Sequence, residues 1–153
     1  MAMDFTPVSP KLIAARFLAT GIVFSVLIVA CVVCAVFLHW AFYIPAGIFA
    51  VWAVVEFAFI RLQVKRLGWK ETEHDLLITR GRWWHTLTVV PYGRIQFIDV
   101  TAGPIDRLFG LRKVQLNTAS ASTDASIPGL PAADADALRD RLTLQAREKA
   151  SGL

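Results

Sequence analysis

The sequence predicts an α+β membrane protein in which an N-terminal transmembrane α-helical hairpin precedes an antiparallel β-sheet or barrel capped by a C-terminal α-helix. Three observations favour this class. Hydrophobic residues make up 56% of the 153 residues and charged residues only 18%, which is more apolar than an average soluble domain. Two long apolar runs precede Arg61. After Trp69 the apolar residues come in short runs broken by Gly, Pro and Asn, a pattern typical of strands.

Residues 1–15 are predicted to form a short flexible leader, since Met1 to Pro10 contains two prolines and shows no apolar periodicity. An uncharged run then extends from Phe17 to Leu38, which exceeds the roughly 20 residues that span a bilayer as a helix. A signal peptide also begins with basic residues, but this run ends in Phe37-Leu38-His39-Trp40, which is a poor cleavage site. We therefore expect a retained transmembrane helix over about 17–38.

A second apolar run, from Ala41 to Ile60, is interrupted only by Glu56. The link between the two runs is so short that the helices, within residues 16–62, must form an antiparallel hairpin. Basic residues gather at the end of this hairpin that carries both termini: Lys11, Arg16, Arg61, Lys65, Arg66 and Lys70. The positive-inside rule therefore predicts that the N- and C-termini both lie in the cytoplasm.

Residues 67–149 are predicted to form one cytoplasmic domain. Arg80-Gly81 favours a tight turn between its first two clear strands, and Ile105 to Phe109 is expected to form one helical turn. In the segment from Arg94 to Ala102, alternation places Ile95 and Phe97 on one face of the strand and Ile98 and Val100 on the other. The predicted strands are His74 to Thr79, Arg82 to Val90, Arg94 to Ala102, Leu111 to Ala119 and Ala125 to Pro128, with a weaker first strand around Leu67 to Thr72.

The chain is predicted to close with a helix over about 132–149. Ala135, Leu138 and Leu142 follow one another at i, i+3 and i+7, so they share one face of this helix. A single amphipathic helix after several short strands is expected to cover one open end of the sheet or barrel.

A series of short motifs runs from Val90 to the closing helix: Pro91, Arg94-Ile95-Gln96, Ile98-Asp99-Val100, Gly103-Pro104, Arg107, Gly110-Leu111, Thr118-Ala119, Pro128-Gly129-Leu130, and Leu138 with Leu142. Their order resembles the bacterial pleckstrin-homology-like (PH-like) domain family, of the membrane-anchored type with an N-terminal transmembrane helix pair. This resemblance implies seven strands and a C-terminal helix, a place in the bacterial inner (plasma) membrane, and binding or assembly instead of catalysis. The motif residues expected to be structural are Pro91, Arg94, Gln96, Asp99, Gly103, Pro104, Arg107, Gly110 and Thr118.

No residue pattern points to an enzyme, a metal site or a cofactor. Cys31 and Cys34 match C-x-x-C, but both fall inside the first apolar run, where a thiolate is strongly disfavoured. His39, His74 and His85 lack companions at the spacing of zinc ligands. The net charge of +4 comes mainly from the membrane flanks, so it does not indicate a nucleic-acid partner.

Two sets of charged residues are candidates for binding. Glu56 is the ionisable residue within a transmembrane run, and we expect it to contact a partner or Thr20 on the facing helix. A set of basic residues is a candidate for contact with lipid headgroups or phosphate, although such residues also determine topology: Arg61, Lys65, Arg66, Lys70, Arg80 and Arg82.

Three functions remain open from the sequence. In the first, a non-enzymatic PH-like module binds a protein or peptide partner through a groove or strand edge at the cytoplasmic face of the membrane. In the second, the hairpin makes the chain an accessory subunit of a larger membrane complex or transporter, through Glu56. In the third, the PH-like domain binds anionic lipid headgroups.

Overall fold

The computed structural model describes residues 5–81, 84–119 and 125–152. The fold class is α+β, as the sequence predicts. Seven strands are described, together with a helical hairpin, two 3₁₀ turns, one short helix and a closing helix. In chain order they are β1 (Thr6–Pro7), α1 (Lys11–Phe37), η1 (Trp40–Phe42), α2 (Tyr43–Lys65), β2 (Gly68–Glu71), β3 (Asp75–Arg80), β4 (Thr86–Pro91), η2 (Tyr92–Arg94), β5 (Ile95–Thr101), α3 (Pro104–Leu108), β6 (Leu111–Thr118), β7 (Ala125–Pro131) and α4 (Ala132–Ser151).

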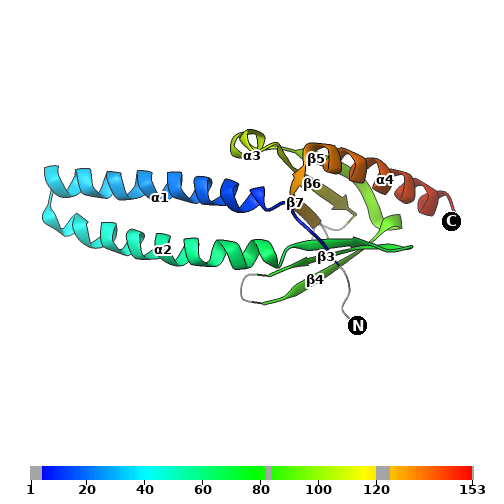
Figure 1. The fold of residues 1–153 in the computed structure, drawn as a ribbon, viewed down its shortest axis with the longest axis horizontal. Coiled ribbons are helices and arrows are strands. Elements are labelled where there is room, and N and C mark those ends of the chain that lie inside the picture. The colour runs from blue at the N-terminus through cyan, green and yellow to red at the C-terminus, as the bar shows by residue number, and fades with distance from the viewer. Residues whose placement is uncertain (1–4, 82–83, 120–124, 153) are drawn as a thin grey trace.

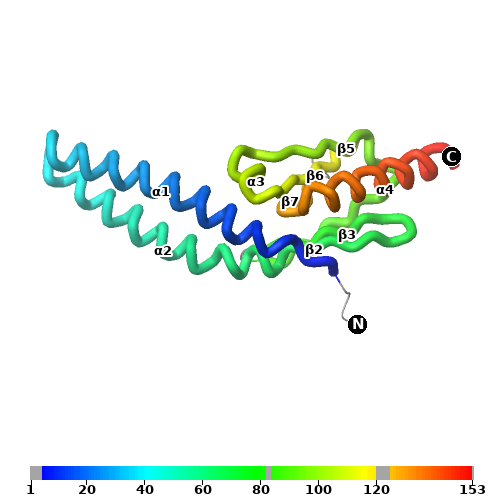
Figure 2. Tube along the Cα trace, turned by 45° about the horizontal axis from the view of Figure 1, so that its top comes forward, coloured from blue at the N-terminus to red at the C-terminus, as the bar shows by residue number. Residues whose placement is uncertain are grey.

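The helices α1 and α2 lie side by side and project from one end of the β-rich part of the molecule (Figure 1, Figure 2). Phe17 and Phe57 stack between them, with ring centroids 5.2 Å apart and planes 9° from parallel. Most of the other apolar side chains of the hairpin point outward and are exposed. Both helices are long and apolar enough to cross a membrane, so lipid is the medium that would cover this surface.

Both helices differ in their bounds from the prediction, because each continues beyond the apolar run at the end that meets the strands. At about 1.5 Å per residue, α1 is roughly 40 Å long, whereas the hydrocarbon core is about 30 Å thick. Leu12 of α1 and Val64 of α2 are buried in this extra length, and Ile60 is buried at the end of the predicted run. The ends of the hairpin therefore belong to the core of the strand-bearing part, which we call the β domain (β1–β7, α3 and α4).

The first strand of the β domain precedes the hairpin, which corrects the predicted flexible leader over residues 1–15. Thr6 and Pro7 pair antiparallel with Trp69 and Gly68 of β2, and the four-stranded sheet has the order β1-β2-β3-β4. Helix α1 already begins at Lys11. A two-residue strand has no periodicity to detect, and its partner lies beyond the hairpin. The hairpin is thus inserted between the first two strands of one sheet.

The connection between β3 and β4 is longer than the predicted Arg80-Gly81 turn. Strand β3 ends at Arg80 and β4 begins only at Thr86, so the predicted strand from Arg82 is shorter than expected. Within β4, Val90 is fully buried while Leu87 and Val89 are exposed. Exposure therefore alternates over Leu87 to Val90, whereas Thr86 and Leu87 at the start of the strand are both exposed.

The second sheet has the order β5-β6-β7, and a bulge in β5 overturns the alternation predicted there. Ile95 pairs with Thr118 and Phe97 with Asn117, so Gln96 is an extra residue on β5. A bulge of this kind changes which residues face inward. Ile95, Ile98 and Val100 consequently all pack against the core, although the sequence placed Ile95 on the opposite face.

Helix α4 packs against β5, β6, β7 and the turn η2, so it covers the second sheet (Figure 1). Ala135, Leu138 and Leu142 are fully buried on its inner face, which confirms the face predicted from their spacing. The buried side chains of α4, of both sheets and of the domain end of the hairpin form one continuous cluster. The hairpin and the β domain therefore share a single core.

Replacing Gly129 by Ala should destabilise the protein more than replacing Gly110 by Ala. Both glycines have positive φ, +74° and +67°, so both substitutions carry a backbone cost of about 1–2 kcal/mol. A Cβ at Gly129 would also lie 2.6 Å from Cδ2 of Leu12, whereas one at Gly110 meets nothing within 4 Å. We expect Gly129→Ala to cost a further 1–3 kcal/mol or so from overpacking.

Chemical unfolding of the full-length protein in detergent micelles measures both effects. A Leu12→Ala background removes Cδ2 and Cγ of Leu12 but leaves its Cβ, 2.9 Å from a Cβ at Gly129. The extra cost of Gly129→Ala over Gly110→Ala should therefore become smaller in that background without vanishing. Equal costs for the two glycine substitutions in the wild-type background would contradict a close contact between α1 and β7.

Candidate functional site

A groove runs along β5 beside the C-terminal half of α4. It has a volume of about 420 Å³, and β5 is the edge strand of its sheet among the described residues. Successive residues of a strand point to opposite faces of its sheet. Four consecutive residues can therefore line the same groove only if the groove follows the edge of the strand. The lining residues are Ile95, Gln96, Phe97, Ile98, Thr143, Ala146, Arg147 and Ala150.

The turn η2 positions the start of β5. Pro91 ends β4 in an extended conformation, and Tyr92, which is fully buried, donates a hydrogen bond of 3.0 Å from its hydroxyl to the carbonyl of Thr72. Burial, together with the negative charge of Glu71, raises the pKa of the Tyr92 phenol. The side chains of Lys149 and His74 are 2.9 Å apart (Nζ to Nδ1), which brings the end of α4 to the same corner.

The remaining motif residues lie at turns and pairing positions near this sheet. Gly103 precedes α3 and Pro104 is its first residue, and the carbonyl of Gly103 accepts a 3.0 Å hydrogen bond from Arg107 N–H. Gly110 adopts a positive φ, and its carbonyl accepts a bond of 3.2 Å from Ala132 N–H at the start of α4.

On β5 itself, Asp99 accepts a 3.1 Å hydrogen bond from the Asn117 side-chain amide. Thr118 pairs with Ile95 at the start of this strand, and Arg94 closes η2. All of these residues therefore lie where they can shape β5 and its connections.

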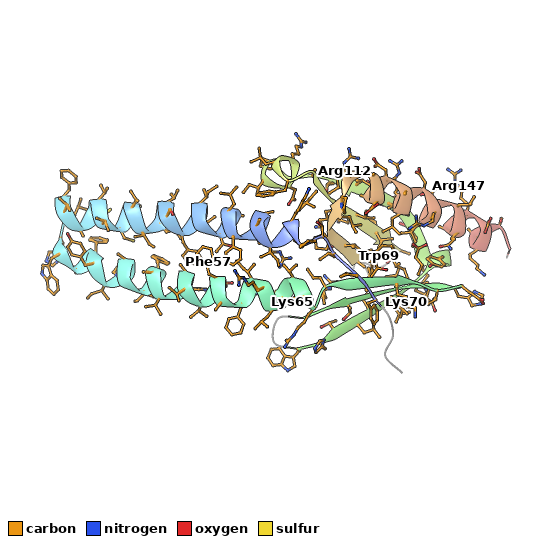
Figure 3. All side chains as sticks on the ribbon, in the orientation of Figure 1. Phe57, Lys65, Trp69, Lys70, Arg112 and Arg147 are labelled. Atoms are coloured by element: carbon orange, nitrogen blue, oxygen red, sulfur yellow. The ribbon has the colours of Figure 1, made fainter. Side chains whose placement is uncertain are left out.

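Two ion pairs hold α4 to the two sheets, and the sequence did not identify either pair. Nη1 of Arg112 on β6 is 2.8 Å from both carboxylate oxygens of Asp136 on α4, and Figure 3 shows Arg112 beside this helix. Nη2 of Arg141 on α4 is 2.8 Å from Oε1 of Glu71 on β2. The partners are far apart in sequence, so only the helix packing brings them together.

The structure separates the basic residues that the sequence grouped as a candidate for lipid or phosphate contact. The Arg61 guanidinium lies 5.9 Å from the ring centroid of Phe17. Lys65 and Arg66 line a recess beside β1. Lys70 is within β2, and Figure 3 places it farther from the hairpin than Lys65. Arg82 lies outside the described residues.

Arg80 instead lines a second recess, at the junction of the hairpin and the four-stranded sheet. Its volume is about 350 Å³. Arg16 lines the recess too, and its Nη1 donates a hydrogen bond of 3.3 Å to Oε1 of Gln63. Sequence reasoning treated Arg16 only as a topology signal and missed Gln63. The lining residues are Arg16, Gln63, Leu67, Arg80, Gly81, Trp84 and Thr86.

Within the hairpin, Glu56 has a partner on its own helix. Its carboxylate accepts a hydrogen bond of 3.3 Å from the indole nitrogen of Trp52, one turn earlier on α2. Cys31 and Cys34 are free cysteines of intermediate burial on α1. Figure 3 shows Phe57 between the two helices, where it forms part of their contact.

Comparison with known proteins decides the family. A family model described as "Bacterial PH domain" matches residues 13–146, which run from near the start of α1 through α2 and β2 to β7 and include most of α4. The chain belongs to this bacterial PH domain family. The UPF0699 transmembrane protein YdbS of Bacillus subtilis (strain 168) is 32% identical over 125 residues, which cover 79% of this chain and 77% of the relative. No solved structure matches.

Family membership confirms the predicted resemblance to membrane-anchored PH-like proteins. The chain is a membrane-associated PH-like protein, and its family is not a known enzyme family. The matched region includes the hairpin as well as most of the β domain, which is the PH-like domain of this family. The two parts therefore occur together in the family pattern. This agrees with the shared core of hairpin and PH-like domain.

Replacing Tyr92 by Phe should remove about 1 kcal/mol of stability near pH 8, because the carbonyl of Thr72 loses its hydrogen-bond donor. The raised pKa of Tyr92 means that the fold favours the neutral phenol. That contribution is fully present below the unfolded-state pKa of about 10 and is lost as the pH rises through the folded-state pKa. The difference between the unfolding free energies of the two proteins, measured from pH 8 to 11.5, should therefore be constant below about pH 10 and shrink as the pH rises above it.

Tyr43 provides the matched control, since it lies exposed at the far end of the hairpin. Tyr43→Phe should keep the alkaline loss of stability that the wild type shows. A constant difference between wild type and Tyr92→Phe over the whole range would refute a buried, hydrogen-bonded phenol.

Proposed function

We propose that this chain is a non-enzymatic PH-like module of the bacterial inner membrane that binds an extended segment of a protein partner along β5. The observation that carries the proposal is the groove between the edge of β5 and α4. An edge strand presents unpaired N–H and C=O groups, and an added peptide strand satisfies them.

The side chains around the groove define what the peptide should carry. Phe97 is 55% exposed on β5, an unusual position for a large aromatic residue unless it packs against something else. The small side chains of Ala146 and Ala150 on α4 leave room for an apolar side chain of the partner. Arg147 supplies a positive charge on the same helix. We therefore infer a segment that pairs with β5, inserts an apolar side chain and places an acidic group near Arg147.

The groove faces away from the membrane in this proposal. Figure 3 places Arg147 toward the end of α4 that is remote from the hairpin. The hairpin end with Lys11, Arg16, Arg61 and Lys65 lies next to the domain, and the positive-inside rule puts such an end in the cytoplasm. With this orientation both termini and the groove are cytoplasmic, and the partner can be a cytoplasmic protein or the cytoplasmic segment of a membrane protein.

The alternative of an accessory subunit that assembles through Glu56 has less support. A buried intramembrane carboxylate is a strong reason to expect a partner helix, but this carboxylate accepts a hydrogen bond from Trp52 of its own helix. We therefore assign the hairpin an anchoring and positioning role and assign recognition to the PH-like domain.

Site-specific photocrosslinking in cells tests the proposal directly. A photoreactive phenylalanine analogue at Phe97 should crosslink to a discrete partner in the full-length protein. The same analogue at Leu108, an exposed apolar residue on α3, should not yield that product. In the same assay Ala146→Tyr should reduce the crosslink at least tenfold, because the larger side chain fills the groove.

Leu144→Tyr is the matched control, since Leu144 is exposed on the same helix but does not line the groove. It should leave the crosslink unchanged. The proposal fails if position 97 yields no discrete product, or if the two tyrosine variants behave alike.

A further inference from the structure

The recess at the junction of the hairpin and the four-stranded sheet has the character of an anion site. Two guanidinium groups from elements far apart in sequence line it: Arg16 from α1 and Arg80 from the end of β3. None of the described residues that line it is acidic. Among the described residues, neither arginine forms a salt bridge. Two positive charges that converge without a carboxylate between them favour an anionic ligand.

Other donors converge on the same recess. The Gln63 side chain accepts a hydrogen bond from Arg16 through Oε1, so its Nε2 is the donor end of the amide. This Nε2 is buried and has no hydrogen-bond partner among the residues that the structure describes, which is costly and uncommon. Thr86, whose side chain carries a hydroxyl that can donate a hydrogen bond, also lines the recess. Asp106 on α3 interacts electrostatically with Arg16, but it does not line the recess.

The position of the recess narrows the choice of anion. It lies where the exposed apolar surface of the hairpin gives way to the β domain: Leu18, two residues after Arg16, and Leu62, next to Gln63, are both exposed. Trp84 is 81% exposed at its rim, and indole side chains favour the interface between hydrocarbon and water. Leu67 and Trp84 give the recess an apolar wall, which a free ion does not use but which glycerol and acyl carbons can contact.

We propose that this junction recess binds a phosphate group, held by Arg16 and Arg80, of the kind carried by the headgroup of an anionic phospholipid. A guanidinium matches phosphate oxygens through paired, planar N–H donors. The site uses the hairpin as well as the domain, and it differs from the peptide groove in its residues, its ligand and its place in the fold. It therefore does not depend on the function proposed above.

Native mass spectrometry of the full-length, delipidated protein in detergent tests the site with defined probes. Short-chain phosphatidylglycerol is the lipid probe, short-chain phosphatidylcholine is the zwitterionic comparison, and sn-glycerol 3-phosphate and inorganic phosphate are the soluble probes. We expect one phosphatidylglycerol per chain, bound at least tenfold more tightly than phosphatidylcholine. Arg80→Gln should weaken this binding at least tenfold, and Arg80→Lys should weaken it less, because the charge remains but the planar donors are lost.

Lys65→Gln is the matched control, since it removes one positive charge from the domain end of α2 but not from the recess. It should change the affinity by no more than about twofold, in line with a surface charge that is screened by salt. Arg16→Gln should act like Arg80→Gln. Because Arg16 also bonds to Gln63, its variant is compared by unfolding in the same micelles, and Arg80→Gln keeps the test decisive if Arg16→Gln does not fold.

The soluble probes identify the source of the phosphate. Tighter binding of phosphatidylglycerol than of sn-glycerol 3-phosphate supports a lipid site. Equal binding of the two, still abolished by Arg80→Gln, supports a phosphate site that takes a soluble ligand. The proposal is overturned if Arg80→Gln and Lys65→Gln weaken binding equally, or if no probe binds in a manner that depends on Arg80.

Discussion

The shared core between the hairpin and the β domain is the constraint on which the rest of this structure depends. Ser9 N–H donates a 3.0 Å hydrogen bond to the carbonyl of Gly129, and Leu12 lies so close to Gly129 that no side chain fits there. Ile60 and Val64 of α2 belong to the same buried cluster. Full burial of each large aliphatic side chain is worth about 1.5–3 kcal/mol, so this contact is a substantial part of the stability of a small domain.

This contact changes what the hairpin does. An anchor joined by a flexible linker would hold the domain near the membrane without fixing its direction. Here the hairpin is inserted between β1 and β2, and only Arg66 and Leu67 separate α2 from β2. Both connections are short and both ends are packed. The hairpin therefore sets the direction in which the β domain points. It also sets how far the peptide groove and the junction recess lie from the membrane.

The sequence predicts the parts of the fold that repeat along a single segment. The apolar runs give both membrane helices, and the spacing of Ala135, Leu138 and Leu142 gives the buried face of α4. It does not predict β1, because two residues have no pattern and their partner strand follows the hairpin. It also misplaces Ile95, because one extra residue at Gln96 reverses the alternation that a regular strand would have.

The candidate sites, like β1, depend on contacts between segments that are far apart in the sequence. The sequence identifies Arg80 as a candidate because it is a charged residue beside a glycine. Its neighbours in the recess, Arg16 and Gln63, come from the two helices of the hairpin. The peptide groove likewise joins β5 to α4 across the intervening strands. Each site consists of residues that only the tertiary fold brings together. No local sequence pattern predicts that these residues lie close to one another.

The boundary between anchor and domain is therefore not a point in the sequence. A fragment that begins at Leu67 keeps β2 to β7 and α4 but lacks β1, which leaves the edge of β2 unpaired. It also lacks Val8, Leu12, Ala15, Ile60 and Val64, so part of the core cluster would face water. The junction recess would lose Arg16 and Gln63. The smallest unit that keeps the core, the peptide groove and the junction recess runs from β1 through α4, with the membrane hairpin inside it.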